Sequence, residues 1–297
     1  MVHRAATGPG TLSGTGWAAD VAQTAVSEFV ASLGPMSAAS QLFAQALQVP
    51  LRPGTSDVRI PGAIPTGIAG AFVEEGEPIP VTAWNFAAAT LSSKKLAILT
   101  AITRELAKTG RAEREVRRLL REAAALTLDA YLFSDDAATD AAPAGLFYGL
   151  TPITTQAFDS DALVNDLTAL VAAVAPIGGD RLAYVASPAR AAQISMRVPA
   201  LRFPVFASSA IPDTRIAAVA LDALAVGIDP TPDIYVDSQA SVHMSSEPLE
   251  LVSDNPTTAD PVRSFYQTAS IGIRLILDCD WALRDPGAVA MVEGVAW

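Results

Sequence analysis

Apolar and polar residues alternate along residues 265–283, which read FYQTASIGIRLILDCDWAL. Nine of the ten odd-numbered positions are apolar. The even positions include Thr268, Ser270, Arg274, Asp278 and Asp280. This period of two residues indicates a β-strand with one buried face. Such a strand would be about 60 Å long at about 3.3 Å per residue, whereas strands in globular domains usually end by about ten residues. The pattern therefore predicts a strand longer than an ordinary domain needs.

Other segments place apolar residues at the spacing of a helix, every three or four positions. Residues 112–133 (AEREVRRLLREAAALTLDAYLF) predict the longest helix, charged in its first half and apolar in its second. Its length would be about 33 Å at 1.5 Å per residue. Residues 161–175 predict a second amphipathic helix, with Ser160 as N-cap and Pro176 after its end. Shorter helices are predicted for residues 17–33 and 38–47.

The segment from Pro50 to Pro80 interrupts these patterns with six prolines and five glycines. Prolines at this density exclude helices and central strands, yet residues 58–60, 71–73 and 79–86 favour an extended backbone. We predict an open two-stranded hairpin that projects from the body. A free-standing hairpin buries too little surface to be stable alone, so we expect it to lie on a neighbouring subunit.

Helices and strands alternate between about residues 155 and 250, which predicts a compact α/β lobe. GGDRLAYVAS predicts a turn and a strand, and SPARAAQI predicts a helix capped by its serine. Further short strands are predicted for FPVFAS, RIAAVAL and SVHMSSEPLELV. After the long strand, RDPGAVAMVEGVAW predicts a turn and a last short strand.

The chain is unusually apolar, with 51% hydrophobic residues and a mean hydropathy of +0.33. The longest mostly apolar stretch, residues 167–177 with Thr168 within it, is too short for a membrane helix, which needs about twenty residues. The first residues, MVHRAATGPGTLSGTGW, are no secretory signal and predict a flexible arm. Large subunit interfaces would accommodate the apolar surplus, so the composition favours an obligate oligomer.

The net charge of −11 argues against nucleic-acid binding through a basic surface. The chain has three lysines, and its Arg cluster RAEREVRRLLRE is interleaved with glutamates on a predicted helix. This cluster favours a solvated or inter-subunit helix face. The single cysteine, Cys279, falls on the apolar face of the long strand, which predicts a buried thiol without a disulfide in the chain.

No segment carries the pattern of an active site. The two histidines, His3 and His243, are too few for a metal cluster or a catalytic triad. Acidic residues 135, 136 and 140 lack the spacing of a calcium-binding loop and favour a solvated acidic loop. Gly178-Gly179 precedes a predicted strand, whereas a phosphate site needs a helix N-terminus there. We therefore predict no catalytic residue, metal or cofactor, and disfavour an α/β enzyme.

Four segments together resemble a known family. They are AFVEEGEPIPVTAWNFAAATLSSKKLAILTAITREL (residues 71–106), APAGLFYGL (142–150), PIGGDRLAYVASPARAAQI (176–194) and FYQTASIGIRLILDCDWALRDPGAVAMVEGVAW (265–297). With an arm before them and a long helix and an α/β lobe between them, they resemble the major capsid proteins of tailed bacteriophages. Encapsulins share this Hong Kong 97 type fold. The resemblance in order and spacing covers nearly the whole chain.

The resemblance implies an α+β fold in which a thin subunit is spanned by the long closing strand. Residues 1–50 would form an N-terminal arm with helices, and residues 51–93 an extended loop. A peripheral domain would comprise residues 94–145 and 256–297, with its spine helix at 112–133. Residues 146–255 would form an axial α/β domain. Two sets of residues are expected at inter-subunit contacts. The extended loop contributes Glu74, Glu75, Glu77, Ile79 and Trp84. The spine helix contributes Arg114, Arg117, Arg118 and Arg121.

The function implied by the resemblance is structural. Copies of the chain would form the pentamers and hexamers of a closed icosahedral shell, enclosing double-stranded DNA without sequence-specific binding. Scaffolding, portal and decoration proteins are the expected partners, and no membrane is expected to be involved. The protein would be located in the virion capsid, which is assembled in the host bacterial cytoplasm. An encapsulin-like compartment is the alternative, with residues 17–33 as a dock for an enzyme cargo. The content of the shells, DNA or protein, distinguishes the two.

The sequence departs from the family at one chemical feature. Some members link subunits covalently through a lysine of the extended loop and an asparagine, but residues 50–90 contain no lysine. Lys94 and Lys95 follow where the loop rejoins the body. We therefore predict a shell held by non-covalent contacts alone. Many relatives also begin with a scaffolding segment that is later removed, and the residues before Trp17 are too few for one. We expect either a separate scaffolding protein or a mature form.

Overall fold

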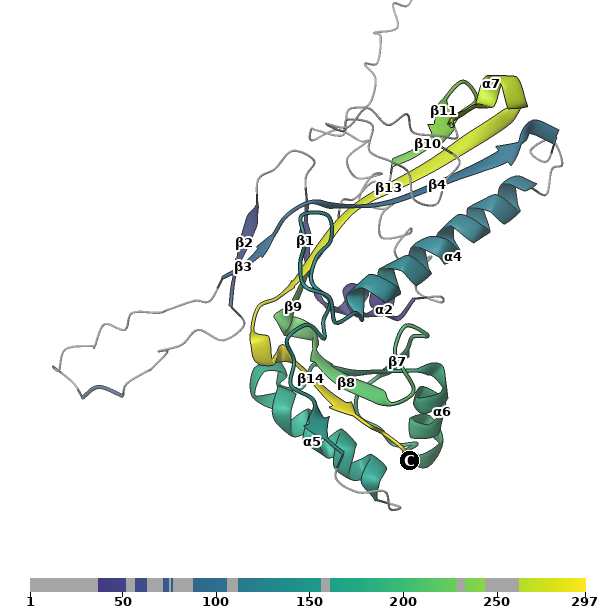
Figure 1. Ribbon diagram of the computed structural model, residues 1–297. Helices are drawn as coiled ribbons and strands as arrows, with labels where there is room; N and C mark the ends of the chain where they lie inside the picture. The colour runs from purple at the N-terminus through teal and green to yellow at the C-terminus, as the bar shows by residue number, and fades with distance from the viewer. Residues whose placement is uncertain are drawn as a thin grey trace, which may run out of the picture. The chain divides into compact units, whose positions relative to one another are not determined.

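The computed structural model describes residues 37–51, 57–62, 72–74, 76, 88–105, 112–155, 161–228, 233–243 and 262–297. The chain divides into two compact units, and Figure 1 labels most of the helices and strands that they contain. The first comprises Met1–Lys95, Ala125–Thr231 and Asp278–Trp297, and the second comprises Leu96–Ala124 and Pro232–Leu277. Both contain helices and strands, so the fold is mixed α and β. The predicted arm and the helix at residues 17–33 lie outside the described residues.

A five-stranded sheet forms the main core of the first unit. Its strands lie in the order β5 (Ile153–Thr154), β14 (Val289–Glu293), β8 (Arg215–Ala220), β6 (Leu182–Ala186) and β7 (Val205–Ala207). The central strand β8 is antiparallel to both of its neighbours, whereas the outer pairs β5–β14 and β6–β7 are parallel. All residues of β6 and β8 are buried, and all of them except Arg215 at the start of β8 are apolar.

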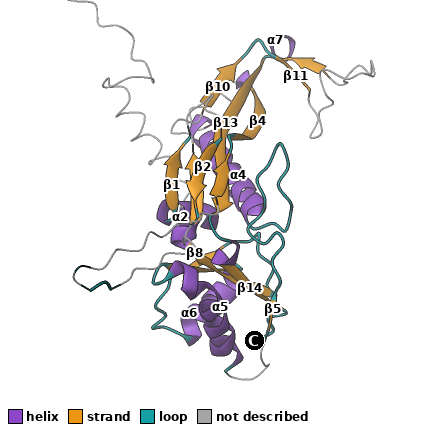
Figure 2. Cartoon of the chain, turned by 90° about the vertical axis from the view of Figure 1, so that its left-hand side faces the viewer, coloured by secondary structure: helices purple, strands orange, loops and turns teal. Residues whose placement is uncertain are grey.

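Two helices accompany this sheet, as the sequence predicts. α5 (Ala162–Gly178) packs on β8 and β14, and α6 (Pro188–Arg197) contacts β6 and β7 (Figure 2). Ser187 caps α6, because its hydroxyl accepts the N–H of Arg190 at 3.3 Å. The prediction that α5 ends before Pro176 is wrong. The helix continues to Gly178, since Ile177 packs against the core.

Strand pairing crosses the boundaries predicted for the lobe. The last strand, placed by sequence with the peripheral segment 256–297, is β14 and pairs with β8 inside the lobe sheet. Conversely, β9 (Leu224–Ile228) and β10 (Asp233–Asp237) fall within the predicted lobe range but pair with the long strand β13 (Ser270–Leu283). Strand pairing joins segments far apart in sequence, so local periodicity did not reveal these partners.

The remaining strands of the first unit form two pairs, β1 (Leu47–Pro50) with β9 and β2 (Val58–Pro61) with β3 (Ala88–Leu91). α2 (Ala38–Gln45) ends two residues earlier than predicted, because Leu47 begins β1, which runs parallel to β9. β2 and β3 pair antiparallel. The strand predicted at residues 58–60 is confirmed as β2, whereas its partner β3 begins two residues after the predicted extended segment 79–86. Ile60 and Leu91 from this pair are buried with Leu51 and Ala225 in a small apolar cluster.

The long helix is confirmed as α4 (Ala112–Leu132). Near its end, the buried carboxylate of Asp129 accepts the Ser37 hydroxyl at 2.5 Å and the Ser208 hydroxyl at 2.6 Å. It also accepts the backbone N–H groups of Ala38 and Ala39 at 3.2 and 3.0 Å, at the N-terminus of α2. These donors and the helix dipole compensate the buried charge. Asp129 therefore fixes the point where α2 begins.

In the second unit, β13 pairs with β10 and with β4 (Lys94–Thr103). β11 (Ser241–His243) and β12 (Val262–Ser264) form a separate antiparallel pair. The predicted strand of 19 residues is shorter, because residues Phe265–Thr268 form the one-turn helix α7 and β13 has 14 residues. Ala269 follows α7 with a φ of +47°, a left-handed conformation that ends the helix before the strand begins.

The facing of β13 agrees in part with the alternation. Leu275, Leu277, Cys279 and Trp281 are buried as predicted, whereas Ile273 is only partly buried. The predicted burial of Cys279 is thus confirmed, and burial together with the carboxylates of its two neighbours raises the pKa of its thiol to about 12. The buried Asp280 departs from the pattern, since its position on the polar face predicts exposure.

Candidate functional site

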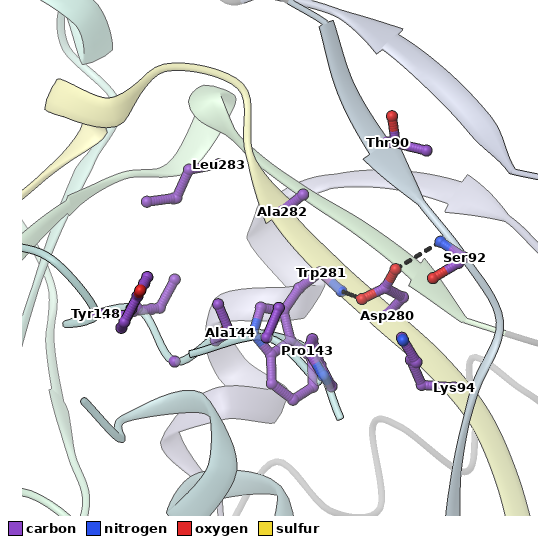
Figure 3. A pocket seen from close by; sticks show the side chains of 13 residues that line it. Thr90, Ser92, Lys94, Pro143, Ala144, Tyr148, Asp280, Trp281, Ala282 and Leu283 are labelled. Atoms are coloured by element: carbon purple, nitrogen blue, oxygen red, sulfur yellow. Dashed lines mark hydrogen bonds between the residues drawn. The ribbon is translucent and has the colours of Figure 1, made fainter. Parts of the chain in front are cut away.

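An open cleft of about 380 Å³ lies in the first unit beside the point where β3 meets β4. Residues from β3 and β4, from the loop after α4 and from the end of β13 surround it (Figure 3). Its lining comprises Thr90, Ser92, Lys94, Ala138, Pro143, Ala144, Gly145, Leu146, Tyr148, Asp280, Trp281, Ala282 and Leu283. We call this cleft, together with the hydrogen-bonded Pro61, Gly62 and Arg284, the hairpin root, because β13 and the residue after it bind both strands of the hairpin here.

Asp280 connects β13 to the hairpin root. Its Oδ2 accepts the backbone N–H of Ser92 at 2.6 Å, and its Oδ1 accepts the N–H of Trp281 at 2.8 Å (Figure 3). Its side chain is 4% exposed. Burial raises the pKa of the Asp280 carboxyl, although these hydrogen bonds and the charge of Lys94 act in the opposite direction. The hydrogen bonds that favour the charged form come mainly from the backbone N–H groups of Ser92 and Trp281.

Lys94 and Trp281 hold the loop that follows α4. The Lys94 amine donates to the carbonyl oxygens of Thr139 and Asp140 at 2.8 and 2.9 Å. The Trp281 indole N–H donates to the carbonyl of Ala144 at 2.8 Å. Because both donors come from strands, the predicted acidic loop is anchored to the hairpin root although its residues 135–141 are exposed.

The other strand of the hairpin is held by Arg284, the residue after β13. Its Nε donates to the carbonyl of Pro61 at 2.8 Å, and its Nη2 donates to the carbonyl of Gly62 at 3.0 Å. Its Nη1 donates to the carbonyl of Asp222 at 2.9 Å. The end of β13 therefore contacts both strands of the hairpin, β2 through Arg284 and the end of β3 through Asp280.

Part of the acidic loop is engaged in an ion pair. Arg215 of β8 donates through Nη1 to both carboxylate oxygens of Asp135 at 2.9 Å and through Nη2 to Glu293 at 3.1 Å. Its guanidinium also lies 5.3 Å from the ring centroid of Phe147. Asp135 thus binds a cation from within the chain, which adds to the case against a calcium loop.

Within the described ranges, no three His, Cys, Asp or Glu residues are grouped as metal ligands would be. In the same part of the chain, no helix has the length and apolar character needed to cross a bilayer.

The predicted inter-subunit residues are partly described. Glu74 is exposed, whereas Glu75, Glu77, Ile79 and Trp84 lie outside the described residues. On α4, Arg118 and Arg121 are exposed, and Arg118 pairs with Glu122 at 3.1 Å. The backbones of Arg114 and Arg117 lie on the same helix, but their side chains are outside the described part. The inter-subunit role of all these residues stays a prediction.

Sequence reasoning missed the residues of the hairpin root. Asp280, Arg284 and Lys94 bind backbone groups, and backbone groups leave no signature in a sequence. One signal was present, the acidic residue between Cys279 and Trp281 in DCDW. A carboxylate next to two buried apolar residues was a candidate for a buried, hydrogen-bonded role.

Comparison with known proteins defines the class of this chain. The model of the phage capsid family matches residues 21–294. The chain therefore belongs to the phage capsid family.

Individual relatives agree with this assignment. The chain is 28% identical over 339 aligned positions to the capsid polyprotein of Pseudomonas phage PAJU2, and the match covers 100% of this chain and 48% of the relative. The chain thus spans about half the length of this curated relative. Both descriptions name capsid proteins.

Solved structures share the fold at low sequence identity. A structure from Mycobacterium phage Adephagia has a TM-score of 0.59 at 15% identity, and the match covers 88% of this chain and 91% of that one. The capsid of an empty gene transfer agent particle has a TM-score of 0.58 at 16% identity, with the same coverage of 88% and 91%.

Proposed function

We propose that this protein is the major capsid protein of a tailed phage or a phage-like particle, with a Hong Kong 97 type fold. Copies of the chain self-assemble into the pentamers and hexamers of an icosahedral head that encloses double-stranded DNA. The DNA is enclosed without sequence-specific binding. Scaffolding, portal and decoration proteins are proposed partners, and the location is the virion capsid, assembled in the host cytoplasm.

The observation that carries this proposal is the family match over residues 21–294, which includes nearly every described element. The nanocompartment alternative is not favoured, because the matched family and the curated relative are both described as phage capsid proteins. The net charge of −11 suits a container that does not adhere to packaged DNA.

Exposed apolar side chains support assembly from copies of this chain. In the second unit, all five residues of β10 are exposed, including Tyr235 at 53% and Val236 at 66%. Among the described residues β10 lies at the edge of its sheet, and an exposed apolar edge strand favours association. Outside β10, the described large apolar residues with at least half of their surface exposed are Phe72, Leu99, Leu119, Leu126, Tyr148, Val164, Met196 and Tyr266.

In this proposal the parts of the chain have distinct structural roles. The sheet of β5, β14, β8, β6 and β7 with its two helices is the axial domain, now including the last strand. α4 is the spine helix of the peripheral domain, and the segment between β2 and β3 is the extended loop. Contacts of this loop with an adjacent subunit account for a hairpin whose described apolar attachment to the body is one small cluster.

Assembly of the wild-type chain tests the proposed function. We expect the purified protein, alone or with its scaffolding protein, to form closed particles of uniform diameter in negative-stain electron microscopy. Particles isolated from phage-producing cells are expected to contain nuclease-protected double-stranded DNA. A chain that stays monomeric under all assembly conditions, or native particles filled with an enzyme instead of DNA, contradicts the proposal.

We expect the assembled shell to be non-covalent. Residues 50–90 contain no lysine, and the amine of the nearby Lys94 is occupied by two carbonyl groups. Boiled particles are expected to migrate as a single band of about 31 kDa on a denaturing gel, given the chain mass of 30.8 kDa. A ladder of multimers that disappears in Lys94→Arg/Lys95→Arg particles would refute this expectation.

A further inference from the structure

The hairpin root contains two charged side chains whose contacts are directed at the hairpin. We propose that Asp280 and Arg284 are positioning residues, which fix the direction in which the β2–β3 hairpin leaves the body and thereby the geometry of the shell. This inference rests on the proposed function, because it assumes that the hairpin contacts an adjacent subunit.

Apolar packing holds the hairpin without fixing its direction. β2 and β3 have four residues each, and their buried side chains in the small cluster are Ile60 and Leu91. The hydrophobic effect depends on buried area and is not directional. A cluster of this size therefore keeps the hairpin attached but allows it to tilt.

The hydrogen bonds at the root are directional. Arg284 presents a planar guanidinium whose donors have a fixed arrangement, and three of them bind the carbonyls of Pro61, Gly62 and Asp222. Asp280 binds the N–H of Ser92 at 2.6 Å on the other strand. One strand is therefore held by a donor and the other by an acceptor, so tilting in either direction stretches at least one bond.

Both residues stand on a rigid support. They are four positions apart at the end of β13, where Cys279 to Leu283 pair with Ile228 to Leu224 of β9. The backbone N–H of Arg284 continues this pairing with a bond to the carbonyl of Ala223 at 2.8 Å. A displacement of these side chains would require that the β9–β13 pairing also moves.

A small change of the angle at the hairpin root becomes a large displacement at the tip of the loop. The 25 residues 63–87 join Gly62 to Ala88. A chain of this length that leaves and returns reaches at most about 40 Å, because an extended residue spans about 3.3 Å. A tilt of about 10° then displaces its tip by about 7 Å, more than twice the length of a hydrogen bond. Contacts at the tip require the root to be fixed.

The experiment compares subunit stability with particle geometry in three variants. Arg284→Met removes the three-way donor, and Asp280→Asn replaces one of two acceptor oxygens by an NH₂ group. Arg181→Met is the matched control, because Arg181 also binds a backbone carbonyl, that of Gln45 at 2.8 Å, and pairs with Asp222. Among the contacts described for Arg181, none involves the hairpin.

We expect the Arg284 and Asp280 variants to fold, with a Tm within about 5 °C of wild type. Closed particles of wild-type diameter are expected to decrease about tenfold, which corresponds to 1.4 kcal/mol, in favour of open or irregular assemblies. The control is expected to assemble normally. Arg284→Lys keeps the charge but not the planar donor, so its particle defect is expected to be intermediate.

Two results would overturn the inference. One is that Arg284→Met and Asp280→Asn both give closed particles of wild-type diameter and yield. The other is that both variants lose cooperative folding, since the two residues would then act on subunit stability. Failure of the wild-type chain to form particles would instead contradict the proposed function, so the two failures are distinguishable.

Discussion

Replacing residues 63–86 with Asn-Gly is expected to give a folded subunit that does not assemble. Pro61 and Ala88 are paired across the two strands, so a short turn between Gly62 and Ala87 can close the hairpin. The replacement keeps Ile60 and Leu91 in their buried cluster. The free energy of unfolding of the subunit is therefore expected to be nearly unchanged, whereas particles in negative-stain microscopy are expected to be absent.

The boundaries of this deletion come from the structure. A deletion of residues 56–80, which the proline-rich pattern alone suggests, would also remove β2 and the buried Ile60, and would lower stability as well as assembly. A control variant carries a Gly/Ser segment of equal length in place of residues 63–86, which keeps the chain length but removes the side chains. It is also expected to fold without assembling. Normal shells from the Asn-Gly variant would rule out the proposed role of the hairpin.

Leu275→Asp is expected to prevent folding of the subunit. Leu275 is 1% exposed and lies opposite Ile234 of β10. An unpaired charge at a buried position costs several kcal/mol, which is comparable to the total stability of about 5–15 kcal/mol of a typical domain. Solubility after expression and urea unfolding of any soluble fraction measure the effect. Leu275→Ala, with an expected loss of about 2–5 kcal/mol, provides a milder variant for the same titration.

Leu99→Asp is the matched control for this prediction. It introduces the same residue on β4 of the same unit, where Leu99 is 53% exposed. Its effect on the free energy of unfolding is expected to stay below about 1 kcal/mol. Ile273, which the alternation treats like Leu275, is only partly buried and is expected to be less sensitive. A soluble Leu275→Asp protein with the wild-type urea midpoint would show that the facing of β13 is misjudged.

Much of the local structure was predictable because its cause is local. The apolar spacing of residues 112–133 predicts α4, whose bounds differ by one residue from the prediction. The serine before Pro188 predicts the cap of α6. The resemblance carried by segments such as residues 71–106 pointed to the phage capsid family, to which the chain belongs. The domain boundaries and the inter-subunit residues that it implied remain predictions.

Other features were outside the reach of the sequence because their causes are not local. Alternation predicted a strand from residue 265, but Ala269 adopts a left-handed conformation and α7 precedes β13. Periodicity gave the facing of the last strand but not its partner, and β14 joins the sheet of β8. At the hairpin root, Asp280 and Arg284 bind peptide groups that belong to residues of many types, so no motif marks them.

The sequence by itself determined the elements whose periodicity, capping and turn residues agree, and the family to which the chain belongs. It did so because helix and strand patterns depend on neighbours within a few positions. The tertiary structure alone decided that a buried carboxylate and an arginine at the end of β13 hold the two strands of the hairpin. Those contacts join residues more than 180 positions apart. Their geometry depends on strand pairing, which brings distant segments together only in the folded chain.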